Sequence, residues 1–97
     1  MKYHFEWDWE KAKSNLTKHK ITFKDATSVF RDENAISISD EEHSEEEERW
    51  ITIGLDSATR TLIVIHTFMS IDEDNCSIRM ISARKATKHE QKIYKEG

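Results

Sequence analysis

The chain has 97 residues, of which 36% are hydrophobic and 35% are charged, and its formal net charge is −4. This length supports one domain, expected over residues 1–97, and excludes separate cofactor and substrate domains. The single cysteine excludes an intrachain disulfide, and the lack of a long apolar run or a signal-peptide pattern excludes a membrane span and predicts a cytoplasmic protein.

The N-terminal third of the chain predicts one strand followed by two helices. Residues 3–7 have the composition of a short strand. Asp8 is expected to cap a helix over residues 9–19, because a carboxylate at that position can accept a free backbone N–H. A second helix is expected at residues 22–30, where Thr22 begins a pattern that resembles a capping box.

The remaining two thirds alternate as strands do and end in a helix. Residues 62–68 are apolar on both faces, which is typical of a central strand. Residues 56–60 are expected to form a turn, residues 70–75 a polar loop, and residues 87–95 a helix with a capping box. Strands are expected at residues 35–39, 50–55, 62–68 and 77–84. The pattern predicts an α+β fold: an antiparallel sheet of about four strands, with two N-terminal helices and one C-terminal helix packed on it.

The charges are unevenly distributed along the chain. Residues 40–48 hold seven acids and no base, residues 11–24 hold five lysines and no acid, and residues 77–97 hold six bases against two acids. The negative net charge alone argues against a partner that is a polyanion. Because a polyanion responds to the local field, the basic segments can still bind one.

The basic C-terminal segment is the first candidate site. Arginine on a strand offers a planar fork that matches phosphate oxygens, and Arg79 lies between two apolar residues of a predicted strand. A solvated basic face explains the same pattern. In a regular strand Arg79 and Arg84 lie on opposite faces, so they converge only if a bulge intervenes or if the strand ends before Arg84. The segment contains Arg79, Arg84, Lys85, Lys88, Lys92, Tyr94 and Lys95.

Other candidates have structural interpretations beside the functional ones. His66 in the central strand is either a hydrogen-bonded core residue or a general acid–base group. The acidic run at 40–48 is a solvated loop, an ion site or an RNA mimic, and its last residue, Glu48, enters the next strand together with Arg49. The three tryptophans either pack in the core or stack on unpaired bases. The histidines lack a tight ligand spacing, so we expect neither a metal nor another cofactor.

Three ordered blocks of the sequence resemble the BrnT toxins, within the wider RelE-like group of bacterial toxins. Residues 5–32 are similar to the family pattern FEWD-x-x-KA-x-x-N-x-x-KH and the helix that follows it. Residues 40–54 resemble its HS-x-x-EER segment, and residues 78–94 resemble its IRIISAR-x-A-T stretch with a downstream Glu and Tyr. The chain departs from the pattern at turns and helix ends: Lys20 and Thr59 stand where Gly is common.

The resemblance implies a ribonuclease toxin of a type II toxin–antitoxin system that blocks translation. It also implies a BrnA-like antitoxin, with two toxins and two antitoxins in the complex and promoter DNA contacted through the antitoxin. In such an enzyme the 2′-hydroxyl of the RNA attacks the adjacent phosphorus without a metal, and the protein stabilises the charge and moves two protons.

We therefore expect Arg79 and Arg84 to contact the phosphate, with Lys85 in support, and Tyr94 to transfer a proton or stack on a base. His66 and Glu48 are further acid–base candidates. Additional RNA contacts are expected from Lys88, Lys11, Lys13 and Arg49. The alternative is a module of the same fold that binds RNA or a protein without cleavage.

Overall fold

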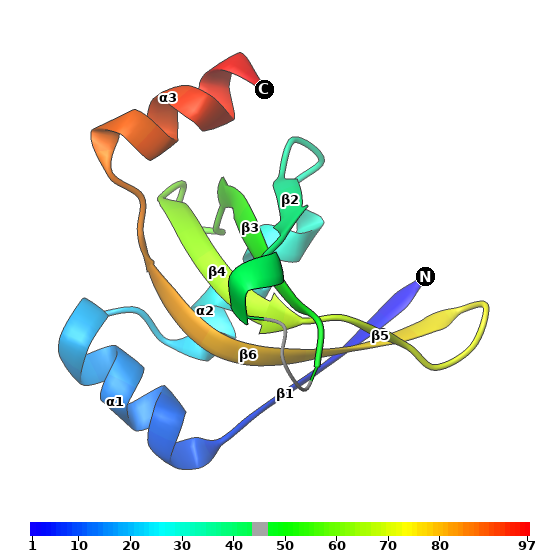
Figure 1. The fold of residues 1–97 in the computed structure, drawn as a ribbon. Coiled ribbons are helices and arrows are strands. Elements are labelled where there is room, and N and C mark those ends of the chain that lie inside the picture. Colours follow the sequence, from blue (N-terminus) through cyan, green and yellow to red (C-terminus); the bar gives the residue numbers. More distant parts are fainter. Residues whose placement is uncertain (44–46) are drawn as a thin grey trace.

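The computed structural model describes residues 1–43 and 47–97. Within these residues the chain forms a six-stranded sheet with the order β1-β6-β4-β3-β2, and β5 pairs with β6 (Figure 1). Two short 3-10 helices, η1 and η2, flank β2. The strands are β1 (Lys2–Trp7), β2 (Ile36–Ser39), β3 (Arg49–Leu55), β4 (Thr61–Thr67), β5 (Met69–Ser70) and β6 (Asn75–Lys85). The helices are α1 (Trp9–His19), α2 (Phe23–Ala26), η1 (Thr27–Arg31), η2 (Glu41–His43) and α3 (Lys88–Glu96).

The sheet is mixed and has six strands, so the prediction of an antiparallel sheet of about four strands is wrong in strand direction and in strand number. β1 runs parallel to β6, from the pair Lys2↔Asn75 to the pair Trp7↔Met80, whereas the other pairs are antiparallel. The chain leaves β1 through α1 and α2, and only returns beside it with the last strand. β5 adds a two-residue strand next to the predicted loop at 70–75. Strand composition indicates that a segment is extended, but it does not indicate which segment will pair with it.

The predicted helix starts are confirmed by their caps. The Asp8 carboxylate accepts the Glu10 N–H at 2.8 Å and begins α1. Thr87 and Glu90 accept each other's backbone N–H groups and form the capping box of α3. The second helix is only partly α-helical, because from Thr27 onward it tightens into η1. No helix among the described residues is long and apolar enough to cross a membrane.

One face of the sheet is covered by α1, α2 and η1, and we call it the helical face. Its core contains Phe23, Val29, Leu62 and Ile78, all almost fully buried. Asn15 of α1 is buried there: its side-chain amide donates to the Ala83 carbonyl at 2.8 Å and its carbonyl accepts the Ala83 N–H at 3.0 Å. These bonds fix α1 against β6, because a buried polar group without partners would be costly.

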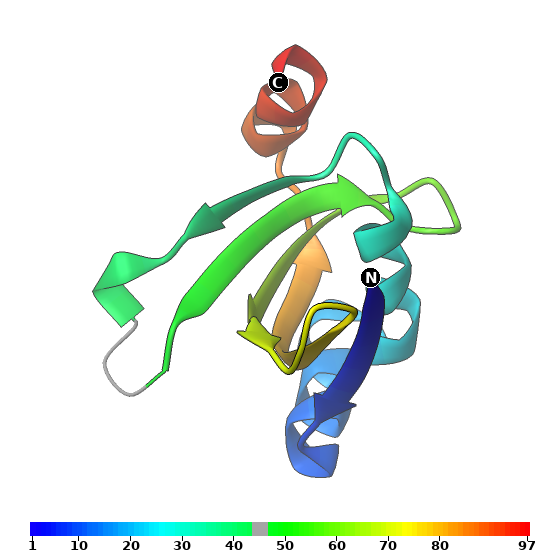
Figure 2. The same ribbon diagram turned by 90° about the vertical axis from the view of Figure 1, so that its right-hand side faces the viewer.

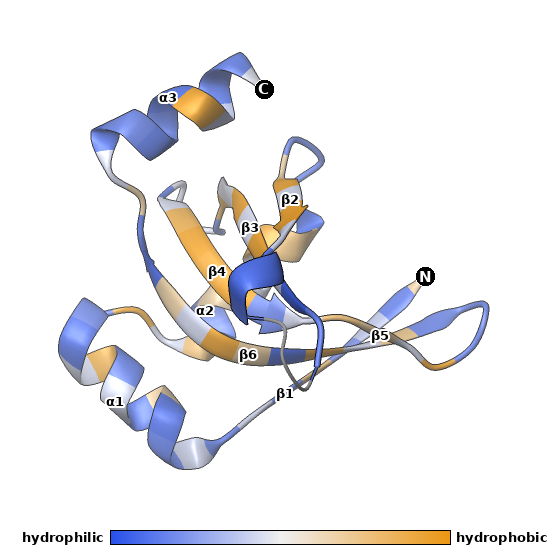
Figure 3. Cartoon of the chain, viewed as in Figure 1, coloured by the Kyte–Doolittle hydropathy of each residue, from blue (hydrophilic) through white to orange (hydrophobic). Residues whose placement is uncertain are grey.

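The opposite face carries a smaller core beneath α3. Ile53 and Ile63 are buried there with Ala86, and Tyr94 of α3 packs against them. Figures 1 and 2 show α3 and α1 on opposite sides of the sheet. The apolar colour is concentrated on β3 and β4, whereas α1 and α3 are largely hydrophilic (Figure 3). The two ends of the chain therefore cover different faces of one sheet.

Two turns hold residues in the left-handed conformation. Lys20, after α1, has φ 60°, and Thr59, between β3 and β4, has φ 62°. Glycine, which has no Cβ, would adopt this conformation without a steric penalty.

Candidate functional site

A bulge in β6 determines which side chains share a face of the sheet. Ile65 of β4 pairs with Ser82, but the next residue, His66, pairs with Met80, so Ile81 is the extra residue. Ile78, Met80 and Ala83 consequently all reach the core of the helical face. The neighbours that point the other way, Arg79 and Arg84, therefore lie on one face despite their odd and even numbers.

We call this surface the arginine face; it carries the side chains of Arg49, Arg79 and Arg84. Arg49 joins it because Ile51 and Ile53 of the same strand belong to the core under α3. All three arginines are half-buried. Partly buried Ile51 and Ile65 lie between them and give the face an apolar floor.

Arg79 forms an ion pair with Glu47, a residue that the sequence analysis did not single out. Both side chains are partly exposed, so a ligand can reach the pair. The predicted Glu48 is an exposed neighbour that precedes β3. The acidic run at residues 40–48 indicated that a carboxylate could lie near the arginines, but the sequence alone does not indicate which carboxylate pairs with an arginine. Residues 44–46 of that run lie outside the described residues.

Arg84 is held by Glu90 in a two-pronged ion pair. Its two terminal nitrogens donate to the two carboxylate oxygens at 2.8 and 2.9 Å. The hydrogen bond from Arg84 lowers the pKa of Glu90 to about 2, and the same bond raises the pKa of Arg84. Because Glu90 also accepts the Thr87 N–H, Arg84 is tied to the first turn of α3.

Tyr94 packs on the same face of the sheet as the arginines, against Ile53 and Ile63, but its hydroxyl is bonded to Asp32 and not to an arginine. Its hydroxyl donates to Asp32 Oδ2 at 2.6 Å, and this bond raises the pKa of Tyr94 to about 12. Burial would raise the pKa of Asp32, but hydrogen bonds from the Leu55 N–H, the Tyr94 hydroxyl and the Asn34 N–H outweigh it and lower the pKa. The phenol is therefore protonated near neutral pH and connects α3 to the segment before β2.

His66 points to the helical face, away from the arginines. Its Nδ1 lies 2.9 Å from the Thr67 carbonyl, which can only accept, so Nδ1 carries the proton of the neutral ring. Nε2 then accepts from the Thr52 hydroxyl at 2.6 Å, and Thr52 in turn accepts from Ser37 at 2.7 Å. Burial lowers the pKa of His66. The structure thus places His66 in a buried hydrogen-bond chain and does not bring it to Arg79 or Arg84.

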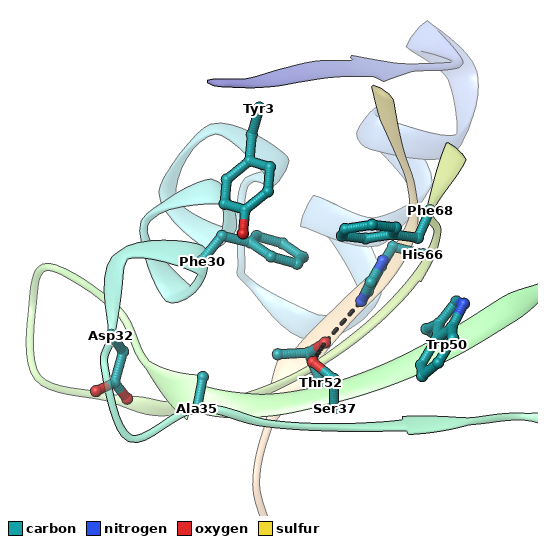
Figure 4. A pocket seen from close by; sticks show the side chains of 9 residues that line it. All are labelled: Tyr3, Phe30, Asp32, Ala35, Ser37, Trp50, Thr52, His66 and Phe68. Atoms are coloured by element: carbon teal, nitrogen blue, oxygen red, sulfur yellow. Dashed lines mark hydrogen bonds between the residues drawn. The ribbon is translucent and has the colours of Figure 1, made fainter. Parts of the chain in front are cut away.

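The hydrogen-bonded side chains of Ser37, Thr52 and His66 form the base of a cavity of about 340 Å³, which we call the aromatic cleft (Figure 4). The Phe30 ring meets the His66 ring edge-on, with centroids 4.8 Å apart. Ser37 and Thr52 lie on the β2–β3 side of the cleft, and Asp32 lies near one end. The aromatic side chains that line it are Tyr3, Phe30, Trp50, His66 and Phe68.

The four lysines predicted to contact RNA do not lie together on one surface. Lys85 ends β6 and Lys88 begins α3, so both are exposed near Arg84 in the chain. Lys11 and Lys13 lie on α1, which covers the helical face, and the ammonium of Lys13 is 5.8 Å from the ring centroid of Trp9. The structure therefore does not bring Lys11 and Lys13 to the arginine face. Within residues 1–43 and 47–97, no group of three or more His, Cys, Asp or Glu side chains is arranged to hold a metal ion.

Comparison with known proteins gives a match to one family and to a solved structure. Residues 7–90 match the family described as "Ribonuclease toxin, BrnT, of type II toxin-antitoxin system". The crystal structure of the Brucella abortus ribonuclease toxin BrnT is similar at a TM-score of 0.64 and 20% identity, covering 91% of this chain and 100% of that one. At this identity the structural likeness shows the fold alone. The search of curated proteins found no match.

Proposed function

Because the chain belongs to the BrnT family of ribonuclease toxins of type II toxin–antitoxin systems, we propose that it cleaves RNA on the arginine face. The observation that carries the proposal is the bulge at Ile81, through which Arg79 and Arg84 share a face with Arg49. Guanidinium groups around an apolar floor can hold a phosphodiester by its oxygens and a base by its ring.

Arg79 is the arginine we assign to the scissile phosphate. Its ion pair with Glu47 is exposed enough for a phosphate to enter, whereas both prongs of Arg84 are already bound to Glu90. Arg84 then acts beside the first turn of α3, where Lys85 and Lys88 add positive charge for the flanking phosphates. Stabilising the negative charge that develops on the phosphorane is the main contribution asked of these side chains.

The reaction we propose needs no metal. The 2′-hydroxyl loses its proton to a base and attacks the adjacent phosphorus in line, while the 5′-oxygen leaves and takes up a proton. The products are a 2′,3′-cyclic phosphate and a free 5′-hydroxyl. Glu47 is our candidate base in preference to Glu48, because it already contacts the arginine that would hold the phosphate.

Membership of a type II system implies an antitoxin partner. We extend this to a BrnA-like antitoxin in a complex of two toxins and two antitoxins, with promoter DNA contacted through the antitoxin. The finer expectations of a RelE-like mechanism, inhibition of translation and cytoplasmic action belong to the same proposal.

The test compares Arg79→Ala with Arg31→Ala, which removes an exposed arginine at the end of η1. Each purified protein is incubated with a reporter RNA in EDTA, and the new ends are mapped. We expect Arg79→Ala to cleave about 10²–10³-fold more slowly and Arg31→Ala to match the parent. Parent-rate cleavage by folded Arg79→Ala overturns the assignment. If the parent protein binds the RNA tightly but produces no 5′-hydroxyl ends, the chain is a binding module instead.

A further inference from the structure

The aromatic cleft has the lining of a site for an apolar side chain. The polar groups at its base are bonded to one another: both His66 nitrogens have partners, and the Thr52 hydroxyl donates to His66 while it accepts from Ser37. These three side chains have no free proton to donate to a ligand, because Ser37, Thr52 and His66 each already donate one within this network. The Nε1–H of Trp50, also in the lining, is buried without a partner among the described residues, so it is left to donate to one acceptor of the occupant. The aromatic remainder of the lining favours an apolar or aromatic group over a sugar or a phosphate.

Exposed apolar side chains extend the cleft over the molecular surface. Tyr3 and Phe68 line the cleft, are each 40% exposed, and have ring centroids 6.2 Å apart. Exposed aromatic rings around an apolar cleft indicate a surface that another molecule covers.

The charges around the cleft select the class of partner. The segments that border it, residues 31–43 and 68–75, together contain eight Asp and Glu residues against one Arg and one His. Asp32 lies in the cleft itself, and the exposed Glu41 and Glu42 follow β2 after Asp40, beyond the pair of Ser39 with the cleft residue Trp50. A field of this sign repels the phosphates of RNA and attracts lysine and arginine.

A strand edge lies beside the cleft. β2 pairs with β3 and with no other described strand, and its last residue, Ser39, is paired with Trp50 of the cleft lining. The outward side of such a strand can accept an extended segment through main-chain hydrogen bonds.

We infer that the aromatic cleft and the β2 edge are the docking site of the antitoxin. The occupant is an extended antitoxin segment that places an aromatic or large aliphatic side chain in the cleft and lysines or arginines opposite Asp32, Glu41 and Glu42. This inference rests on the family membership, and it refines the proposed function by separating the antitoxin site from the RNA site. The two sites lie on opposite faces of the sheet.

The separation gives the inference a sharp test with two toxin variants. Phe68→Ala removes an exposed wall of the cleft, and Glu41→Lys with Glu42→Lys reverses the charge of its rim at two exposed positions. A matched control reverses Glu10 and Glu96, which are exposed on α1 and α3. Binding of the purified cognate antitoxin is measured by calorimetry at low and high salt, and cleavage of the reporter RNA is measured without antitoxin.

We expect both cleft variants to bind the antitoxin at least about 10-fold more weakly than the control, with a smaller salt dependence for the charge-reversed protein. Both should cleave RNA at the parent rate and escape neutralisation when the antitoxin is co-expressed. Parent affinity in both variants overturns the inference. If instead Phe68→Ala loses binding of a fluorescein-labelled single-stranded RNA and keeps the antitoxin, the cleft is an RNA site. Failure of the proposed ribonuclease site is distinguishable, because it removes cleavage and leaves the affinities intact.

Discussion

Glu90 stabilises the junction between β6 and α3, and its replacement by glutamine provides a quantitative test. The side chain accepts two hydrogen bonds from Arg84 and one from the Thr87 N–H. Glutamine has a similar size and can still accept the backbone bond, but it lacks the charge that pairs with Arg84. Glu90→Gln therefore removes the ion pair and leaves most of the helix cap.

The structure sets the size of the expected effect. The pKa of Glu90 falls from 4.5 to about 2, and at 1.36 kcal/mol for each pKa unit this difference corresponds to about 3 kcal/mol. Solvent screening reduces that figure, because 38% of the Arg84 side chain and 24% of the Glu90 side chain are exposed. We expect Glu90→Gln to lower the free energy of unfolding by about 1–2 kcal/mol at pH 7.

The sign of the pH dependence follows from the lowered pKa. The folded chain holds the Glu90 carboxylate charged at a pH where the unfolded chain protonates it, so this stabilisation is complete above about pH 4.5 and is lost as the pH falls towards 2. Urea unfolding of both proteins between pH 7 and pH 2.5 measures it. The control is Glu96→Gln, which breaks only the exposed pair with Lys92, 3.9 Å apart. Equal unfolding midpoints for the parent and Glu90→Gln at pH 7 would show that the pair of Arg84 and Glu90 does not stabilise the fold.

Three further predictions concern stability. Tyr94→Phe should lower the free energy of unfolding by about 1 kcal/mol in urea, because Asp32 loses the hydroxyl that donates to it at 2.6 Å. Lys20→Gly should raise the thermal midpoint, with a gain of about 0.5–1 kcal/mol, because φ at this residue is 60°. Stability should fall below about pH 6.5, by at most about 1.4 kcal/mol per pH unit, because burial lowers the pKa of His66 and the unfolded chain binds a proton that the folded chain does not.

Each of these has its own control. Tyr3→Phe removes a hydroxyl from a more exposed ring, and a loss as large as that of Tyr94→Phe would contradict the role of Asp32. Lys18→Gly places glycine inside α1 and should lower the thermal midpoint. A higher midpoint for Lys18→Gly would contradict the assignment of the gain at Lys20 to its left-handed backbone conformation. The fall in the free energy of unfolding below about pH 6.5 should disappear in His66→Gln. If it persists, a group other than His66 takes up the proton on unfolding.

Short-range patterns in the sequence were sufficient to predict most helices and strands and to identify the family resemblance. The helix caps at Asp8 and Thr87 involve residues only a few positions apart, and the strand with two apolar faces is a run of seven residues. The interactions or patterns that identify these elements therefore lie within a short window of sequence. The structure reproduces these elements with small changes at their ends. The family match over residues 7–90 agrees with the resemblance carried by the three sequence blocks.

Which side chains come into contact depends on the packing of the folded chain. The bulge at Ile81 exists because β4 and β6 pair with a shift, and it moves Arg79 to the face of Arg84. The bond between Tyr94 and Asp32 joins residues 62 positions apart, and the ion pair between Arg79 and Glu47 likewise depends on distant segments. Register and long-range pairing are set by the packing of the whole chain, so a local pattern predicts that a residue lies in a strand but does not predict its partner.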